Sequence, residues 1–160
     1  MISQRDITKG KVLVSVAAVI EGKQHEILMI WEGDVPYHKQ WVVPGGYVRS
    51  DETVKQAIVR EVKEETGLVT IPTRLVGIYD DFTSEKDESI HHIVIAYKAD
   101  VIDGRVVFSQ EATAYKWVSI EGALGSPDIP DVIKQVLIGS KKQERRNFIS
   151  RLVRSQYPTF

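Results

Sequence analysis

The chain has 160 residues, of which 42% are hydrophobic and 27% charged, a composition typical of a soluble globular protein. Lys and Arg number 21 and Asp and Glu number 22, so the net charge of -1 gives no overall attraction to nucleic acid or to a membrane. Cysteine is absent, which excludes disulfides, thiolate metal sites and cysteine nucleophiles.

The length predicts one domain that spans residues 1–160. The first ten residues, MISQRDITKG, are polar and lack the apolar core of a signal peptide. No apolar run approaches the length that a membrane span needs. We therefore expect a cytoplasmic protein with neither a membrane nor a nucleic acid as its partner.

Strands dominate the predicted elements of the first 125 residues. Runs rich in β-branched and aromatic residues predict strands at residues 11–20, 27–31, 41–43, 70–79, 90–100 and 115–119. Pro44-Gly45-Gly46 is typical of a turn, and an acidic loop is predicted over residues 80–89. Asp103-Gly104 is a strong hairpin signal.

Two helical regions are predicted. The first begins at a cap supplied by Ser50 or Asp51, runs to Thr66 and stops at Gly67. The second is a helical extension over residues 128–156, with a break at Gly139-Ser140. The fold class predicted from this layout is α+β.

The end of the chain, KKQERRNFISRLVRSQY, combines apolar residues at helical spacing with many Lys and Arg. One interpretation is a helix docked by its apolar stripe, with a solvated basic face. The alternatives are a contact between the two copies of a homodimer and an electrostatic attraction for polyanions.

The first helix places acidic side chains on its apolar side. At about 100° per residue, Glu61 and Glu65 fall within the stripe formed by Val54, Ala57, Ile58 and Val62, and Glu64 lies on its edge. Burying unpaired carboxylates is strongly unfavourable, so a cation should compensate them. Mg²⁺ or Mn²⁺ suits oxygen ligands of this kind. The alternative is a solvated acidic helix end neutralised by Arg60 and Lys63.

The segment from Gly46 to Leu68, GYVRSDETVKQAIVREVKEETGL, fits the pattern G-x5-E-x7-R-E-U-x-E-E-x-G-U at every fixed position, with U an aliphatic residue. This pattern is the box of the Nudix hydrolases, and the chain resembles that family. The resemblance implies a mixed β-sheet sandwiched between helices, with the box as a loop-helix-loop on the sheet. It also implies hydrolysis of a nucleoside diphosphate linked to another group, with Mg²⁺ or Mn²⁺ as cofactor.

The resemblance assigns roles to single residues of the box. Glu64 and Glu65 match the pair that ligates divalent cations, and a backbone carbonyl of Gly45 or Gly46 matches a further ligand. Glu61 matches the first glutamate of the box, which holds metal or water and in some members acts as base. Arg60 matches the arginine that orients the carboxylates, and Glu52 matches a residue that supports the loop. A metal ion bound here would lower the pKa of the attacking water.

A fourth acidic ligand is expected outside the box. Glu111 is the candidate, because it lies six residues before Trp117, the spacing shown by the mutator-type nucleoside triphosphatases of this family. The rival is the acidic cluster Asp80, Asp81, Glu85, Asp87 and Glu88.

Aromatic residues and a histidine are the candidates for substrate binding. Trp31 and Tyr37 border a loop that could stack a base, although core packing is the simpler interpretation of a tryptophan. One of His91 and His92 should face the core side of its strand and the other should face out. His92 is the candidate for a contact with phosphate or with the attacking water.

The substrate class follows only by elimination. Family members that act on ADP-ribose tend to carry a proline about fifteen residues after the box, whereas here Pro72 comes too early and the next proline is Pro127. The tyrosine typical of enzymes that cleave diadenosine polyphosphates is also missing. A nucleoside triphosphate or related nucleotide is the leading hypothesis, with ADP-ribose or another nucleotide sugar as the alternative. An alternative of another class is a non-catalytic nucleotide-binding sensor.

Overall fold

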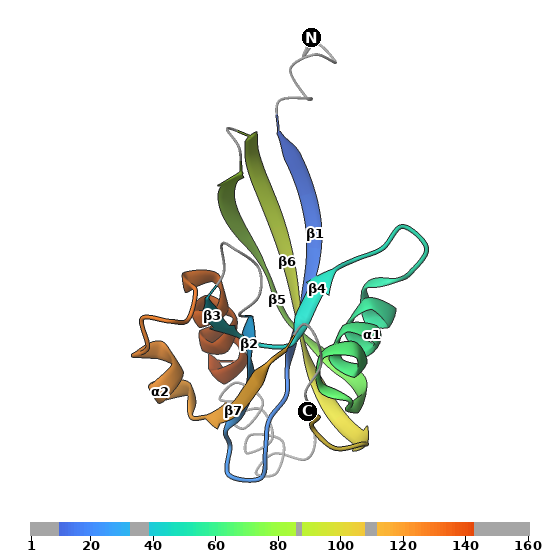
Figure 1. The fold of residues 1–160 in the computed structure, drawn as a ribbon, viewed down its shortest axis with the longest axis vertical. Helices are drawn as coiled ribbons and strands as arrows, with labels where there is room; N and C mark the ends of the chain where they lie inside the picture. The colour runs from blue at the N-terminus through green and yellow to red at the C-terminus, as the bar shows by residue number, and fades with distance from the viewer. Residues whose placement is uncertain (1–9, 33–38, 86–87, 108–111, 143–160) are drawn as a thin grey trace, which may run out of the picture.

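The structure is a computed structural model that describes residues 10–32, 39–85, 88–107 and 112–142 (Figure 1). The strands are β1 Lys11–Val19, β2 Ile27–Glu32, β3 Gln40–Val42, β4 Gly45–Tyr47, β5 Val69–Glu85, β6 Glu88–Asp103 and β7 Ala114–Val118. The helices are α1 Val54–Thr66, α2 Ile120–Leu124 and a further helix whose described part covers residues 131–142. Each strand predicted from the sequence has a counterpart among these elements.

The strands form two sheets. The large sheet has the order β4-β1-β6-β5, and the small sheet has the order β3-β2-β7. In the large sheet β1 runs parallel to β6, while β4 and β5 run antiparallel to their neighbours. The small sheet is antiparallel. The upper part of the large sheet, made of β1, β5 and β6, extends beyond helix α1 and the small sheet (Figure 1).

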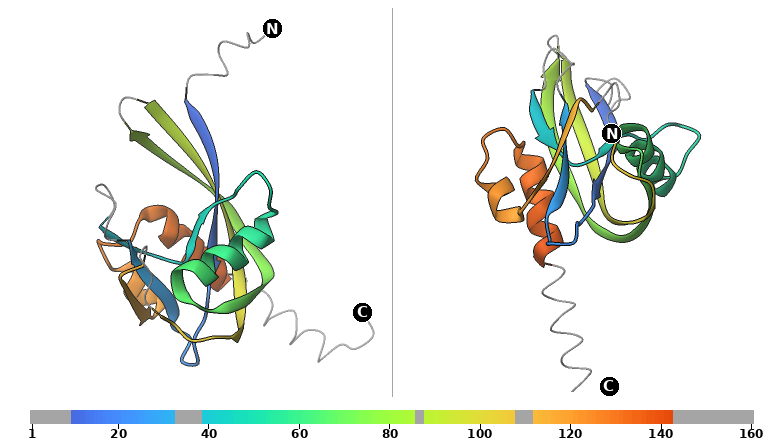
Figure 2. Two further views of the ribbon diagram at one scale, coloured as in Figure 1. Left: turned by 45° about the vertical axis from the view of Figure 1, so that its right-hand side comes forward. Right: turned by 60° about the horizontal axis from the view of Figure 1, so that its bottom comes forward.

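Helices cover opposite sides of this framework, as Figure 2 shows. Val16 and Ala18 of β1, together with Ile20 just after it, pack with Ala57, Ile58 and Val62 of α1 in the first core. The alternate residues Ala17 and Val19 join the second core, which contains Met29 of the small sheet and Val136 and Leu137 of the last helix. Because β1 is apolar on both faces, it lies between two buried layers. The prediction of a mixed sheet between helices is confirmed.

The prediction of an acidic loop at residues 80–89 is wrong. β5 and β6 continue through this segment as one long hairpin, with Asp80 opposite Ile93 and Glu85 opposite Glu88. The strand-forming residues Phe82 and Thr83 directly follow Asp80 and Asp81 and favour the extended conformation. His91 Nε2 lies 2.7 Å from Asp80 Oδ1 across the hairpin, so the Asp80 carboxylate has a hydrogen-bond partner on β6. Of the acidic cluster, Asp87 lies outside the described residues.

The hairpin predicted at Asp103-Gly104 is also wrong. Gly104 does adopt a left-handed conformation, with φ of +89°, but Asp103 is the last residue of β6 and pairs with Val69. The chain then leaves the sheet, and the Val107 N–H donates to the carbonyl oxygen of Thr66 at the end of α1. A Cβ at position 104 would lie 2.6 Å from the Gly67 carbonyl oxygen. The glycine therefore serves close packing against the helix end.

The predicted helix break at Gly139-Ser140 is absent, since residues 131–142 form a continuous helix. Gly139 does not end the helix; it is needed because a larger residue at this position would clash with Tyr79. A Cβ at this position would lie 2.1 Å from the Tyr79 hydroxyl oxygen and 3.4 Å from Tyr79 Cζ. The predicted extension beyond residue 142 lies outside the described residues.

This contact gives a stability prediction. Gly139→Ala should lower the free energy of unfolding by roughly 1–3 kcal/mol, the usual cost of overpacking, in spite of the higher helix propensity of alanine. Adding Tyr79→Phe removes the clashing oxygen, so the double variant should be more stable than Gly139→Ala alone. Urea unfolding of the two single variants and the double variant measures the coupling. If Gly139→Ala lowers the free energy of unfolding equally in the wild-type background and in the Tyr79→Phe background, the clash with the Tyr79 hydroxyl is not the cause.

Candidate active site

The residues of the box form strand β4, a loop and helix α1. The turn predicted at Pro44-Gly45-Gly46 is wrong, because Gly45 and Gly46 belong to β4 and pair with Ala17 and Val16 of β1. The strands approach so closely that a Cβ on Gly45 would lie 2.0 Å from the Val16 carbonyl oxygen. The glycines therefore allow the backbone of β4 to lie tightly against β1.

Helix α1 begins with a capping box at Thr53, one turn later than predicted. The Thr53 hydroxyl oxygen accepts from the Gln56 N–H, and the Thr53 N–H donates to Gln56 Oε1 at 2.9 Å. This reciprocal pair gives hydrogen-bond partners to two backbone N–H groups, those of Thr53 and Gln56. Neither Ser50 nor Asp51 is followed three residues later by a Glu or Gln that could complete such a pair. The helix ends at Gly67, with φ of +74°, as predicted. The ends of the helix thus fix the depth at which its glutamates lie.

The three glutamates in the second half of α1 have the predicted exposures. Glu61 and Glu65 are 8% and 6% exposed, whereas the Glu64 side chain is 42% exposed. Both buried carboxylates adjoin β4. A Cβ on Gly46 would lie 2.5 Å from Glu61 Oε1, and the Gly45 N–H donates to Glu65 Oε2 at 2.9 Å. The predicted grouping of Glu61, Glu65, Gly45 and Gly46 is therefore present.

Arg60 contacts three of the carboxylates of the box, those of Glu52, Glu61 and Glu64. Its Nε donates to Glu52 Oε2 at 2.9 Å and its Nη2 to Glu52 Oε1 at 2.5 Å. Its Nη1 lies 2.6 Å from Glu61 Oε1 and 3.0 Å from Glu64 Oε2. The same guanidinium donates to the Tyr47 carbonyl oxygen at 3.0 Å. Arg60 thus holds the loop, the helix and β4 in one arrangement.

The pairing of Arg60 with Glu52 shifts both pKa values. The hydrogen bonds from Arg60 lower the pKa of Glu52 to about 2, and the hydrogen bonds to Glu52 raise the pKa of Arg60. The stability contributed by Glu52 is fully present above its unfolded pKa of about 4.3. It is lost as the pH falls toward 2. The loop therefore stays fixed by an ion pair throughout the neutral range.

The charges of the site leave room for a divalent cation. The site contains four acidic side chains, Glu52, Glu61, Glu64 and Glu65. Among the described residues, Arg60 contacts three of them, and Arg49 lies 3.6 Å from Glu64. These six residues thus carry an excess of negative charge. All the donor atoms are oxygens, which Mg²⁺ and Mn²⁺ prefer.

The carboxylates are not arranged as a finished metal site. Among the described residues, no group of three or more acidic or histidine side chains surrounds a common position. Glu61 and Glu64 contact Arg60, and Glu65 contacts the Gly45 N–H. The donor chemistry therefore fits a divalent metal, while its binding requires these side chains to turn away from their present partners.

The structure places some of the other candidate residues but not all. Glu111 and Tyr37 lie outside the described residues. Trp31 of β2 packs beside Trp41 of β3 with ring centroids 5.2 Å apart, and Lys116 Nζ lies 4.1 Å from the centre of the Trp41 ring. Trp31 thus takes part in an aromatic cluster on the small sheet, and its role in binding substrate stays a prediction.

His91 and His92 lie on opposite faces of the large sheet, as the strand alternation predicts. Leu13 is opposite His92 and Val12 is opposite His91 in the pairing of β1 with β6. His92 faces the side of the second core, and its Nε2 lies 2.9 Å from the Thr83 hydroxyl oxygen. It also stacks near Tyr47, with ring centroids 6.0 Å apart.

Tyr47 was missed by the sequence reasoning. It follows the two glycines of the box at a variable position, so the pattern gives it no weight. Its exposed ring shares one face of the sheet with His92, and this arrangement follows only from the pairing of the strands. An aromatic residue at the end of a strand that leads into an acidic site is the signal that could have found it.

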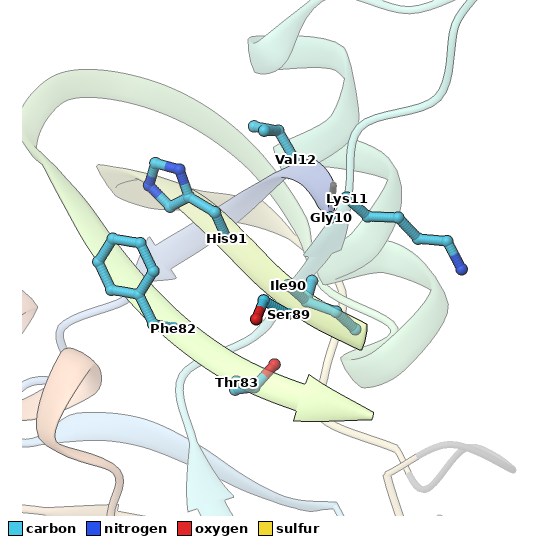
Figure 3. A pocket seen from close by; sticks show the side chains of 8 residues that line it. All are labelled: Gly10, Lys11, Val12, Phe82, Thr83, Ser89, Ile90 and His91. Atoms are coloured by element: carbon cyan, nitrogen blue, oxygen red, sulfur yellow. The ribbon is translucent and has the colours of Figure 1, made fainter. Parts of the chain in front are cut away.

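A shallow hollow of about 410 Å³ lies at the far end of the large sheet (Figure 3). It is lined by Gly10, Lys11, Val12, Phe82, Thr83, Ser89, Ile90 and His91. None of these residues belongs to the box. The hollow is therefore separate from the acidic site.

Comparison with known proteins identifies the family. The profile of the NUDIX domain matches residues 11–137. The chain belongs to the Nudix hydrolase family. The match covers β1 to the last described helix, so the box and the framework around it belong to one domain of this family.

Relatives and a solved structure of this family are similar to the chain. An ADP-ribose pyrophosphatase of Methanocaldococcus jannaschii is 35% identical over 115 residues, which cover 70% of this chain and 67% of that protein. A MutT-like protein of Streptomyces ambofaciens is 30% identical, covering 66% of this chain and 63% of that protein. The matched region thus spans about two thirds of each relative. The crystal structure of a MutT protein from Methanosarcina mazei has a TM-score of 0.72 and 27% identity, covering 87% of this chain and 97% of that one.

The enzymes of the Nudix family generally use divalent metal ions and act on nucleotide substrates. In the described part of the chain, no helix is both long and apolar enough to cross a bilayer.

Proposed function

We propose that the chain is a divalent-metal-dependent pyrophosphohydrolase that cleaves a nucleoside triphosphate or a related nucleotide and releases a nucleoside monophosphate. The observation that supports this proposal is the set of box glutamates gathered around Arg60 beside Gly45 and Gly46. An excess of negative charge at this place costs folding free energy and serves a cation-dependent reaction on a polyanion.

Several residues would hold Mg²⁺ or Mn²⁺ in this site. They are Glu61, Glu64 and Glu65, a carbonyl of Gly45 or Gly46, and Glu111 as a ligand from outside the box. When bound, the metal neutralises phosphate oxygens and lowers the pKa of a coordinated water.

The residues of the chain then position the reaction. Gly45 and Gly46 carry no side chain, so the carboxylates of Glu61 and Glu65 lie directly against the backbone of β4. Arg60, held by Glu52, keeps the loop and the helix in register. Glu61 or Glu64 accepts the proton of the attacking water, a role that typically accelerates a reaction by about 10²–10⁴-fold. Attack at phosphorus breaks one P–O bond of the anhydride, and the phosphorylated leaving group departs.

A second candidate substrate is ADP-ribose. It is favoured by the similarity to the ADP-ribose pyrophosphatase of M. jannaschii. It is disfavoured by the absence of a proline about fifteen residues after the box, since Pro72 and Pro127 do not supply it. Hydrolysis of ADP-ribose would release AMP and ribose 5-phosphate by the same attack of water on phosphorus.

One panel of substrates tests both candidates. The purified chain is incubated with the common nucleoside triphosphates, ADP-ribose, a nucleotide sugar and an RNA with a 5′-triphosphate, each with Mg²⁺ or Mn²⁺, and the products are separated. We expect a nucleoside triphosphate to be cleaved most efficiently and EDTA to abolish the reaction. Inactivity of the folded protein on every compound would instead support the non-catalytic sensor.

A further inference from the structure

The exposed part of the large sheet has two faces of different chemistry. On one face, Phe82 stacks on His91 with ring centroids 4.5 Å apart (Figure 3). Phe82 is 73% exposed, and the neighbouring Val12 and Ile78 are also exposed. On the other face, Tyr47 lies beside His92. Of these two pairs, the second contains Tyr47, whose backbone contacts Arg60 of the acidic site.

The connection runs through the backbone of Tyr47. Its carbonyl oxygen accepts from Arg60 Nη2 at 3.0 Å, and Arg60 contacts Glu61 and Glu64. Tyr47 directly follows Gly45 and Gly46, where the phosphates of a substrate are proposed to bind. Its side chain therefore projects from a backbone that is fixed to the reaction site.

The ring of Tyr47 is presented rather than buried. It is 53% exposed, and its plane is within 23° of the plane of His92. Tyr47 pairs with Ser15 and His92 with Leu13 on the intervening strand β1, so the two rings share one face of the sheet. His92 is held from the far side by Thr83. A flat, partly exposed aromatic surface of this kind binds planar ligands.

We propose that Tyr47, supported by His92, stacks on the base of the nucleotide and is a specificity-determining residue of the enzyme. This inference rests on the proposed function. β4 forms one edge of the large sheet, so a nucleotide with its phosphates at Gly45 and Gly46 can pass around that edge and lay its base on the Tyr47 ring. The contact selects nucleosides over phosphate compounds that lack a base, and it is tolerant of the identity of the base, because every base has a π-face.

Substitution of Tyr47 tests the stacking contact. Tyr47→Leu should raise KM for the preferred nucleotide roughly ten-fold or more, the usual effect of removing an aromatic stacking partner, and should change kcat little. Tyr47→Phe should keep a KM close to that of the wild type, because it retains the ring. Inhibition by inorganic pyrophosphate, which has no base, should be the same in all three proteins.

Phe82→Leu is the matched control. It removes the exposed ring of the Phe82–His91 pair, which lies on the other face of the sheet. Phe82 is far from the box in sequence, and among the described residues it makes no contact with Arg60. We expect its KM to equal that of the wild type. Because both tyrosine and phenylalanine are exposed, neither leucine variant should lose stability, and thermal unfolding checks this.

Two results would overturn the inference while leaving the proposed function intact. The first is an unchanged nucleotide KM in Tyr47→Leu. The second is a parallel weakening of nucleotide and pyrophosphate binding, which would show that Tyr47 acts on the phosphate site through Arg60. Failure of the proposed function has a different signature, since the wild-type protein would then cleave no nucleotide at all.

Discussion

Glu64→Gln and Glu65→Gln should each reduce kcat by roughly 100-fold or more, because each removes a proposed negative oxygen ligand of the metal, and a catalytic metal typically supplies several kcal/mol of transition-state stabilisation. Neither change should unfold the protein. Glu64 is partly exposed, and a glutamine at position 65 can still accept the hydrogen bond from the Gly45 N–H. Turnover is measured with the preferred nucleotide at saturating Mg²⁺, and folding is measured by thermal unfolding.

Asp51→Asn is the matched control for these variants. Asp51 is an exposed acid within the same segment, but it lies at a variable position of the box. The change removes one negative charge and should leave turnover intact. Binding of Mn²⁺, measured directly by electron paramagnetic resonance, adds a readout that does not depend on the reaction. Near-normal turnover and Mn²⁺ binding in both glutamine variants would show that Glu64 and Glu65 do not bind the metal.

Local geometry explains why the centre of the site could be predicted from the sequence. The angular positions of Glu61, Glu64 and Glu65 depend only on helical periodicity, and the burial of Glu61 and Glu65 followed once the apolar stripe of α1 docked on β1. The left-handed stop at Gly67 is likewise a local property. The family resemblance added the expectation of the surrounding framework.

Features set by long-range pairing could not be predicted in the same way. The acidic composition of residues 80–89 favoured a loop, but pairing with β6 kept them extended. The sequence predicts a hairpin turn at Gly104 and a helix break at Gly139, whereas contacts with Gly67 and Tyr79 explain both glycines. The pair of Tyr47 and His92 depends on the register of three strands, and no local pattern encodes that register.

Arg60→Met should lower the free energy of unfolding by roughly 3 kcal/mol when measured in EDTA. The Arg60 side chain is 16% exposed, and its loss leaves the buried Glu61 carboxylate without its guanidinium partner. Removing one member of a buried ion pair is costly because the other charge stays desolvated. Saturating Mg²⁺ should then raise the unfolding temperature of the variant by more than that of the wild type, since a cation that binds only the folded state stabilises it according to its affinity.

The reason for this difference is competition for the same oxygens. In the wild type, Glu61 and Glu64 contact Arg60, whereas in the variant Arg60 no longer competes with the metal for these carboxylates. Arg49→Met is the matched control, because Arg49 is 58% exposed and its ion pair with Glu64 spans 3.6 Å. Its stability and its response to Mg²⁺ should differ little from those of the wild type. An equal shift with Mg²⁺ in the wild type and in Arg60→Met would mean that guanidinium and metal do not share these carboxylates, and the cationic compensation of Glu61 would then belong to Arg60 alone.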